Sequence, residues 1–126
     1  MKFEHFALNV PDARATSLWY VNHLGLAIVR STEDAPYTKF MADETGRVIM
    51  ELYTDTSVSI PDYGAASPLN FHVAFIAEVA KPTQTRLASA GASPFKEVIL
   101  ADGSVLVMMR DPWGVPLQFC QRTKAL

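Results

Sequence analysis

The chain has 126 residues, of which 49% are hydrophobic and 19% charged, and its formal net charge is −2 at pH 7. This length suits one compact domain with its own core, and the slightly acidic balance argues against nucleic acid or a membrane surface as a partner. No apolar run is long enough to span a bilayer, and Met1–His5 lacks the apolar stretch of a secretory signal. Because Cys120 is the only cysteine, no disulfide can form within the chain, and we expect a reducing, cytoplasmic location.

The first part of the chain predicts the element order β-α-β-β-β. Pro11 breaks an initial β-rich run, and the apolar residues that follow share one helical face. Asp12 suits the N-cap of this helix, and Gly25 suits its C-terminal end. The predicted strands are Phe3–Val10, Leu26–Arg30, Tyr37–Met41 and Val48–Tyr53, with Asp43–Gly46 as a hairpin turn.

The second part repeats this order after a connection, Thr54–Pro68, that is rich in Thr, Ser, Pro, Gly and Asp. A connection of this length between elements indicates a role such as covering a site or joining two modules. Pro82 in a first helical turn and Gly91 at the end enclose the predicted second helix. The predicted strands are Leu69–Ile76, Phe95–Leu100, Val105–Arg110 and Val115–Gln121, with turns at 101–103 and 111–114 and a frayed tail at 122–126.

Two pairs of polar residues repeat at one spacing. His72 follows His5 by 67 residues, and Gln118 follows Glu51 by the same 67 residues. We therefore expect an α+β fold in a single domain, 1–126, with pseudo-repeats at about 1–56 and 68–122. Each repeat would be a βαβββ module, and the two modules would form paired, curved, mixed sheets around a central trough.

Glu51 is the most informative of these polar residues, because its strand is otherwise apolar. A carboxylate among such neighbours is costly unless it is paired, hydrogen-bonded or bound to a metal. If both modules turn these positions toward the trough, His5, Glu51, His72 and Gln118 form a nitrogen and oxygen ligand set. That set suits Zn, Ni, Mn, Co or Fe(II), and the bound ion could act as a Lewis acid while Glu51 moves a proton.

Each of these residues also has a purely structural interpretation. A single histidine on an apolar strand is more often a hydrogen-bonded core residue than a ligand, and Gln118 is more often a satisfied buried amide. Cys120 fits a small core residue, and the segment 111–114 fits an ordinary hairpin turn. The matched spacing is what favours the ligand interpretation for the two histidines together.

Further motifs give the chain a family resemblance that covers nearly its whole length. Besides His5, Glu51 and His72, these are the helix end Trp19–Leu26 (WYVNHLGL) and the turn Asp111–Gly114 (DPWG) before the last strand. With them the chain resembles the vicinal oxygen chelate superfamily, which includes glyoxalase I, extradiol dioxygenases and bleomycin-binding proteins. The resemblance implies a divalent metal held by His5, Glu51, His72 and Gln118, a small-molecule substrate and a homodimer.

Two positions depart from the patterns of particular branches. Gln118 stands where glyoxalase I carries a second carboxylate and where extradiol dioxygenases carry a glutamate, so Glu51 is the one strong base of the set. Asn9 stands where glyoxalase I has the arginine that holds the carboxylate of glutathione, which counts against glutathione as a cosubstrate.

Two classes of function remain open. The first is a metal-dependent, glyoxalase-like lyase or isomerase that acts on a small oxygen-rich substrate through an enediolate-type intermediate, with Glu51 as catalytic base. The alternative is a non-catalytic small-molecule-binding protein of the bleomycin-resistance type. In either class we expect the ligand to contact aromatic and thioether side chains, chiefly Phe40, Tyr53, Met109 and Trp113.

Overall fold

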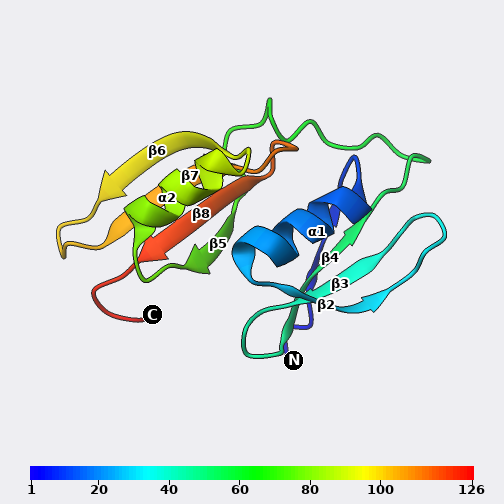
Figure 1. The fold of residues 1–126 in the computed structure, drawn as a ribbon, viewed down its shortest axis with the longest axis horizontal. Helices are drawn as coiled ribbons and strands as arrows, with labels where there is room; N and C mark the ends of the chain where they lie inside the picture. The colour runs from blue at the N-terminus through cyan, green and yellow to red at the C-terminus, as the bar shows by residue number, and fades with distance from the viewer. The chain divides into compact units, whose positions relative to one another are not determined.

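The protein, described here by a computed structural model of all 126 residues, consists of two compact units, Met1–Pro61 (unit 1) and Asp62–Leu126 (unit 2). Unit 1 contains β1 (Phe6–Asn9), α1 (Ala13–Leu24), β2 (Ala27–Ser31), β3 (Lys39–Ala42) and β4 (Val48–Tyr53). Unit 2 contains β5 (Val73–Ile76), α2 (Ala80–Ser89), β6 (Ser93–Ile99), β7 (Val105–Arg110) and β8 (Pro116–Gln121). Two helices and two four-stranded mixed sheets confirm the predicted α+β class and the two βαβββ modules (Figure 1). Neither helix has the length and apolar character that crossing a bilayer requires.

The unit 1 sheet has the strand order β1-β4-β3-β2, with β1 parallel to β4 and the other neighbours antiparallel. The predicted ends of the helix are confirmed. The Asp12 side chain accepts a hydrogen bond from the Ala15 amide at 2.9 Å, and Gly25 ends α1 with a φ of 73°. These two local signals position α1 against β3 and β4.

Successive side chains of β4 point to opposite faces of the sheet, so one face of β4 belongs to the core and the other does not. Met50 and Leu52 are fully buried, as is Tyr20 of α1, so these residues form the core between helix and sheet. Glu51 lies between them in sequence and therefore points to the opposite face of the sheet. We call this the Glu51 face of unit 1.

The unit 2 sheet repeats this topology, with the order β5-β8-β7-β6 and β5 parallel to β8. Its core is formed by fully or nearly fully buried residues of the two central strands and of α2: Val107, Met109, Leu117, Phe119 and Leu87. The N-cap of α2, Val79, has no capping side chain, and the Gln121 side chain of β8 accepts the Ala80 amide hydrogen bond instead, at 2.9 Å.

Two predicted strands begin three or four residues too early. The first begins at Phe6 rather than Phe3, and β5 begins at Val73 rather than Leu69. Before β5, the Asn70 amide bonds to the Ser67 carbonyl at 3.0 Å, which makes a turn where an extended strand was predicted. A β-rich sequence becomes a strand only where a partner strand offers hydrogen bonds, and β8 pairs with β5 only over Val73–Ile76.

Candidate functional site

His5 and Glu51 come together in unit 1. Because β1 lies parallel to β4, with Ala7 opposite Glu51, residues at the start of β1 can reach the Glu51 carboxylate. The His5 Nε2 atom lies 3.3 Å from Glu51 Oε2, and the two side chains are 23% and 22% exposed. The pair is thus largely shielded from water but still accessible.

The second ring nitrogen of His5 is also occupied. Its Nδ1 atom lies 3.0 Å from Oε1 of Glu4, a side chain that is 83% exposed. A neutral imidazole that donates from Nδ1 to this carboxylate has its lone pair on Nε2, on the side of Glu51. A carboxylate or carbonyl at the second nitrogen is also what holds and orients most metal-binding histidines in proteins.

The spacing of the two donor atoms fits a shared metal ion. Metal bonds to imidazole nitrogen and carboxylate oxygen are about 2.0–2.2 Å long, so two ligand atoms on one ion stand roughly 3 Å apart. The 3.3 Å between His5 Nε2 and Glu51 Oε2 agrees with that separation. These two residues form a pair only, since no group of three or more His, Cys, Asp or Glu side chains is arranged to hold a metal ion.

Phe40 and Arg30 extend the Glu51 face. In the strand register Glu51 lies opposite Phe40, and Phe40 lies opposite Arg30, so the three residues form a row across β4, β3 and β2. The Phe40 ring lies edge-on to the His5 ring, with centroids 5.3 Å apart, and the Arg30 guanidinium carbon is 6.0 Å from the Phe40 centroid. Tyr53, two residues after Glu51, belongs to the same face.

His72 of unit 2 has the same kind of anchor as His5. It immediately precedes β5 and is exposed, and its Nδ1 atom lies 2.9 Å from the carbonyl oxygen of the fully buried Pro68. A hydrogen bond from Nδ1 to this carbonyl leaves the lone pair on Nε2. Nε2 is therefore the ring nitrogen of His72 that remains available for a further interaction.

Gln118 lies in β8, half-buried, between Ala74 of β5 and Met108 of β7. The Cys120 thiol donates a hydrogen bond to its side-chain oxygen, with sulfur and oxygen 3.3 Å apart. Burial raises the pKa of the Cys120 thiol, with Arg122 acting weakly in the opposite direction, so the thiol keeps the proton that it donates. A second lone pair remains on the amide oxygen.

The expected ligand-contacting residues have different surroundings. Phe40 and Tyr53 share the Glu51 face, whereas Met109 is fully buried in the unit 2 core. Met108 is the methionine in register with Gln118. Trp113 belongs to the 111–114 turn, where the Asp111 side chain accepts hydrogen bonds from the amides of Trp113 and Val115, both at 2.9 Å.

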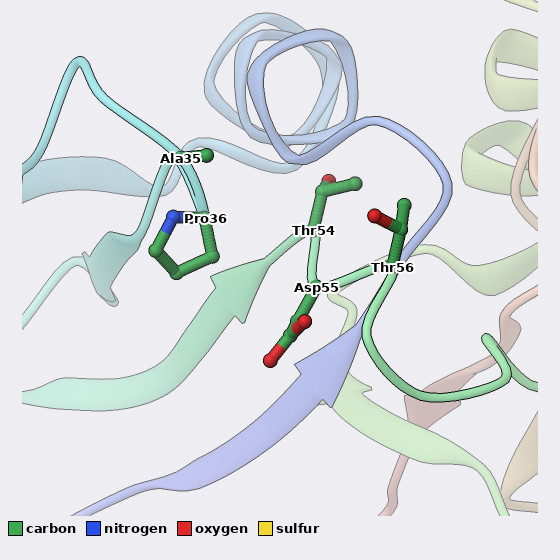
Figure 2. A pocket seen from close by; sticks show the side chains of 5 residues that line it. All are labelled: Ala35, Pro36, Thr54, Asp55 and Thr56. Carbon is green, nitrogen blue, oxygen red and sulfur yellow. The ribbon is translucent and has the colours of Figure 1, made fainter.

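Asn9, at the position of the glutathione-binding arginine, has a structural role. Its side-chain amide donates to the Asp55 carbonyl at 2.8 Å and accepts from the Asp55 amide at 2.9 Å. This exchange fixes the chain just after β4, at the edge of a shallow pocket lined by Ala35, Pro36, Thr54, Asp55 and Thr56 (Figure 2). Hydrogen bonds from the hydroxyl and amide of Ser57 lower the pKa of Asp55, so this carboxylate keeps its negative charge to a lower pH than an ordinary aspartate.

Sequence reasoning missed Glu4 and Arg30. Glu4 is adjacent to His5, but only the folded chain shows that its carboxylate turns toward the ring. Arg30 ends an apolar run, Leu26–Val29, as a polar residue, yet its row with Phe40 and Glu51 depends on a register that includes irregularities in β2, between Ile28 and Arg30, and in β4, between Val48 and Met50.

The family model described as Glyoxalase/Bleomycin resistance protein/Dioxygenase superfamily matches residues 2–119. The chain belongs to this superfamily. Among solved structures, a possible glyoxalase from Bacillus cereus is 21% identical, with a TM-score of 0.68 and coverage of 94% of this chain and 97% of that one. A glyoxalase/bleomycin resistance protein from Albidiferax ferrireducens T118 is 17% identical, with a TM-score of 0.66 and coverage of 95% and 98%.

An E144Q mutant of glyoxalase I from Zea mays is 21% identical with a TM-score of 0.73, and the match covers 98% of this chain but 46% of that one. No curated protein matches the chain. At these identities the structural matches show a shared superfamily fold. Members of the superfamily commonly bind a divalent metal, and the donor atoms of His5 and Glu51 have the chemistry and spacing for one.

Proposed function

We propose that this protein is a metal-dependent, glyoxalase-like lyase or isomerase that acts on a small oxygen-rich substrate through an enediolate-type intermediate. The observation that carries the proposal is the His5–Glu51 pair, with donor atoms 3.3 Å apart and the far side of the His5 ring anchored by Glu4. His72 and Gln118 are the candidates for the remaining ligands. The nitrogen and oxygen donors suit Zn, Ni, Mn, Co or Fe(II).

When bound, such an ion would supply Lewis acidity toward a substrate carbonyl or enediolate oxygen. The protein itself must move the proton, and Glu51 is the residue suited to this step. Its carboxylate has a second oxygen that can take a proton from the carbon next to the carbonyl and return it to the neighbouring carbon. Because Gln118 cannot act as a base, Glu51 must perform both transfers.

The surroundings of Glu51 support this role. Its side chain is 22% exposed, so little water competes with substrate for the carboxylate. Phe40 lies beside it in the strand register and Tyr53 follows on the same face, and both offer flat surfaces to a planar enediolate. The ring contact between Phe40 and His5 also limits the rotation of the histidine.

The test combines metal analysis with a proton-exchange assay. Purified protein should carry about one divalent ion per site, and it should exchange carbon-bound hydrogen of an α-hydroxy ketone such as dihydroxyacetone with D₂O. The Glu51→Gln variant should retain some metal and lose exchange by about 10²-fold or more, the usual contribution of a general base. Glu44→Gln, which makes the same charge change in an exposed turn, is the control.

Protein that holds no metal, and gains no stability from Zn, Ni, Mn or Co, would contradict this function. The second candidate is then a non-catalytic binding protein, which the neutral Gln118 and the aromatic residues of the Glu51 face favour. If the protein is a binding protein of this kind, planar ligands should raise its melting temperature whether or not metal is present. In either case we expect a cytoplasmic homodimer, and light scattering on the purified protein measures the assembly.

A further inference from the structure

Arg30 is a cation on the same face of the unit 1 sheet as the candidate base. The register Arg30–Phe40–Glu51 places the three residues on adjacent strands, directly opposite one another. The 6.0 Å between the guanidinium carbon and the Phe40 centroid confirms that Arg30 lies on the Phe40 side of the sheet. Two strand spacings, roughly 10 Å, separate its backbone from that of Glu51.

The positive charge of Arg30 is not neutralised by a salt bridge within the chain. No carboxylate pairs with its guanidinium, whereas Lys39 and Lys81 each have a glutamate partner at about 3 Å. Its neighbour across the strands is an aromatic ring, which holds the planar guanidinium by a cation–π contact and leaves its N–H donors available. A guanidinium in this state is suited to bind a carboxylate or phosphate through two parallel hydrogen bonds.

We infer that Arg30 and Phe40 form a subsite that binds an anionic group of the substrate, a carboxylate or a phosphate. The substrate is then a carbonyl compound that carries this anionic group several bonds away from its reacting carbon. Phe40 supports the connecting part of the substrate, since its ring contacts both His5, at 5.3 Å, and Arg30, at 6.0 Å. The negative charge of Glu51 keeps the oxyanion away from the base and orients the substrate along the row. The identity of the reacting carbonyl end of the substrate rests on the proposed function. The presence of an anionic end rests on Arg30 alone.

The experiment uses the full chain without added metal, so that its result does not depend on metal binding. Three probes with one phenyl ring are titrated: 3-phenylpropanoate, phenyl phosphate and the neutral 3-phenylpropanamide. NMR follows the Arg30 side-chain Nε–H and the Phe40 ring. Both signals should shift with an anionic probe, and added salt should weaken that binding.

Variants identify the residue responsible. Arg30→Gln should weaken the Kd of the preferred anion at least tenfold, and Arg30→Lys should weaken it less, because a charge remains without the planar fork. The matched control is Arg47→Gln, which removes another guanidinium that lies over a phenylalanine ring of unit 1, 5.6 Å from the Phe3 centroid. Arg47→Gln should change the Kd by less than twofold, and the amide should bind wild type and Arg30→Gln alike.

The comparison of phenylpropanoate with phenyl phosphate tells a carboxylate site from a phosphate site. The inference is overturned if the anions bind Arg30→Gln as tightly as wild type, or if no anion shifts the Arg30 and Phe40 signals. Failure of the proposed lyase is a separate result. In that case metal uptake is absent while the dependence of anion binding on Arg30 persists.

Discussion

At the scale of single residues, His5 is the residue of the candidate site that contacts most of the others. Its ring contacts Glu4 through Nδ1 and Glu51 through Nε2, and it makes a T-shaped ring contact with Phe40. Three contacts define the orientation of a side chain with only two rotatable bonds. A histidine held in this way loses little entropy when it binds a ligand.

Glu4 should therefore act as a positioning residue for metal binding. Glu4→Ala removes the acceptor at Nδ1 and frees the rotation of the ring. Loss of such an outer partner typically costs 10- to 100-fold in metal affinity, and we expect about 3- to 10-fold here because water screens a side chain that is 83% exposed. Competition with a chromogenic chelator measures the Kd. An affinity equal to that of wild type would show that Glu4 does not support His5, and Glu44→Ala serves as the control.

At the scale of secondary-structure elements, the turn between β7 and β8 joins the sheet to the segment that leads to His72. Arg110, at the end of β7, donates hydrogen bonds to the carbonyls of Tyr63, Ala66 and Gly114. Gly114 itself lies against the backbone of Gly64, and a Cβ added there would be 2.7 Å from the Gly64 nitrogen. The 111–114 turn, one of the motifs that carry the family resemblance, thus also anchors the segment before β5.

Gly114→Ala should destabilise the protein by about 3 kcal/mol, the sum of a left-handed backbone cost near 1–2 kcal/mol and the collision with Gly64. Gly46→Ala is a close control, because Gly46 has a φ of 79° against 91° for Gly114 but no atom within 4 Å of the added Cβ. It should show the backbone cost alone. Urea unfolding measures both variants, and equal losses of stability would mean that the Gly64 contact contributes nothing.

At the scale of the whole molecule, a bound metal should appear as added stability. A ligand at 100 times its Kd stabilises the folded state by about 2.7 kcal/mol, which for a chain of this size corresponds to a rise in Tm of roughly 10 °C. We expect this rise with the preferred ion and its reversal by a chelator. His5→Ala should abolish it, and an equal rise in His5→Ala would show that the metal binds elsewhere.

The order of elements could be predicted because its signals are local. Asp12 and Gly25 were recognised as the ends of α1 from residue type alone, and Gly46 and Gly114 occupy the left-handed positions that their turns require. The predicted starts of β1 and β5 were wrong because a strand extends only as far as its pairing with a neighbouring strand, which begins at Phe6 for β1 and at Val73 for β5. Partners such as β5 and β8 are far apart in the sequence.

The sequence by itself determined the α+β class, the two βαβββ modules and the superfamily, since capping, turn chemistry and alternation depend on neighbouring residues. It also singled out Glu51 and His5 by composition and spacing. Only the tertiary structure decided that these two donors lie 3.3 Å apart, that Glu4 and Pro68 hold the histidines through Nδ1, and that Arg30 shares a row with Phe40 and Glu51. The physical reason is register: a shift of one residue between strands moves every side chain to the other face, and long-range pairing alone sets that register.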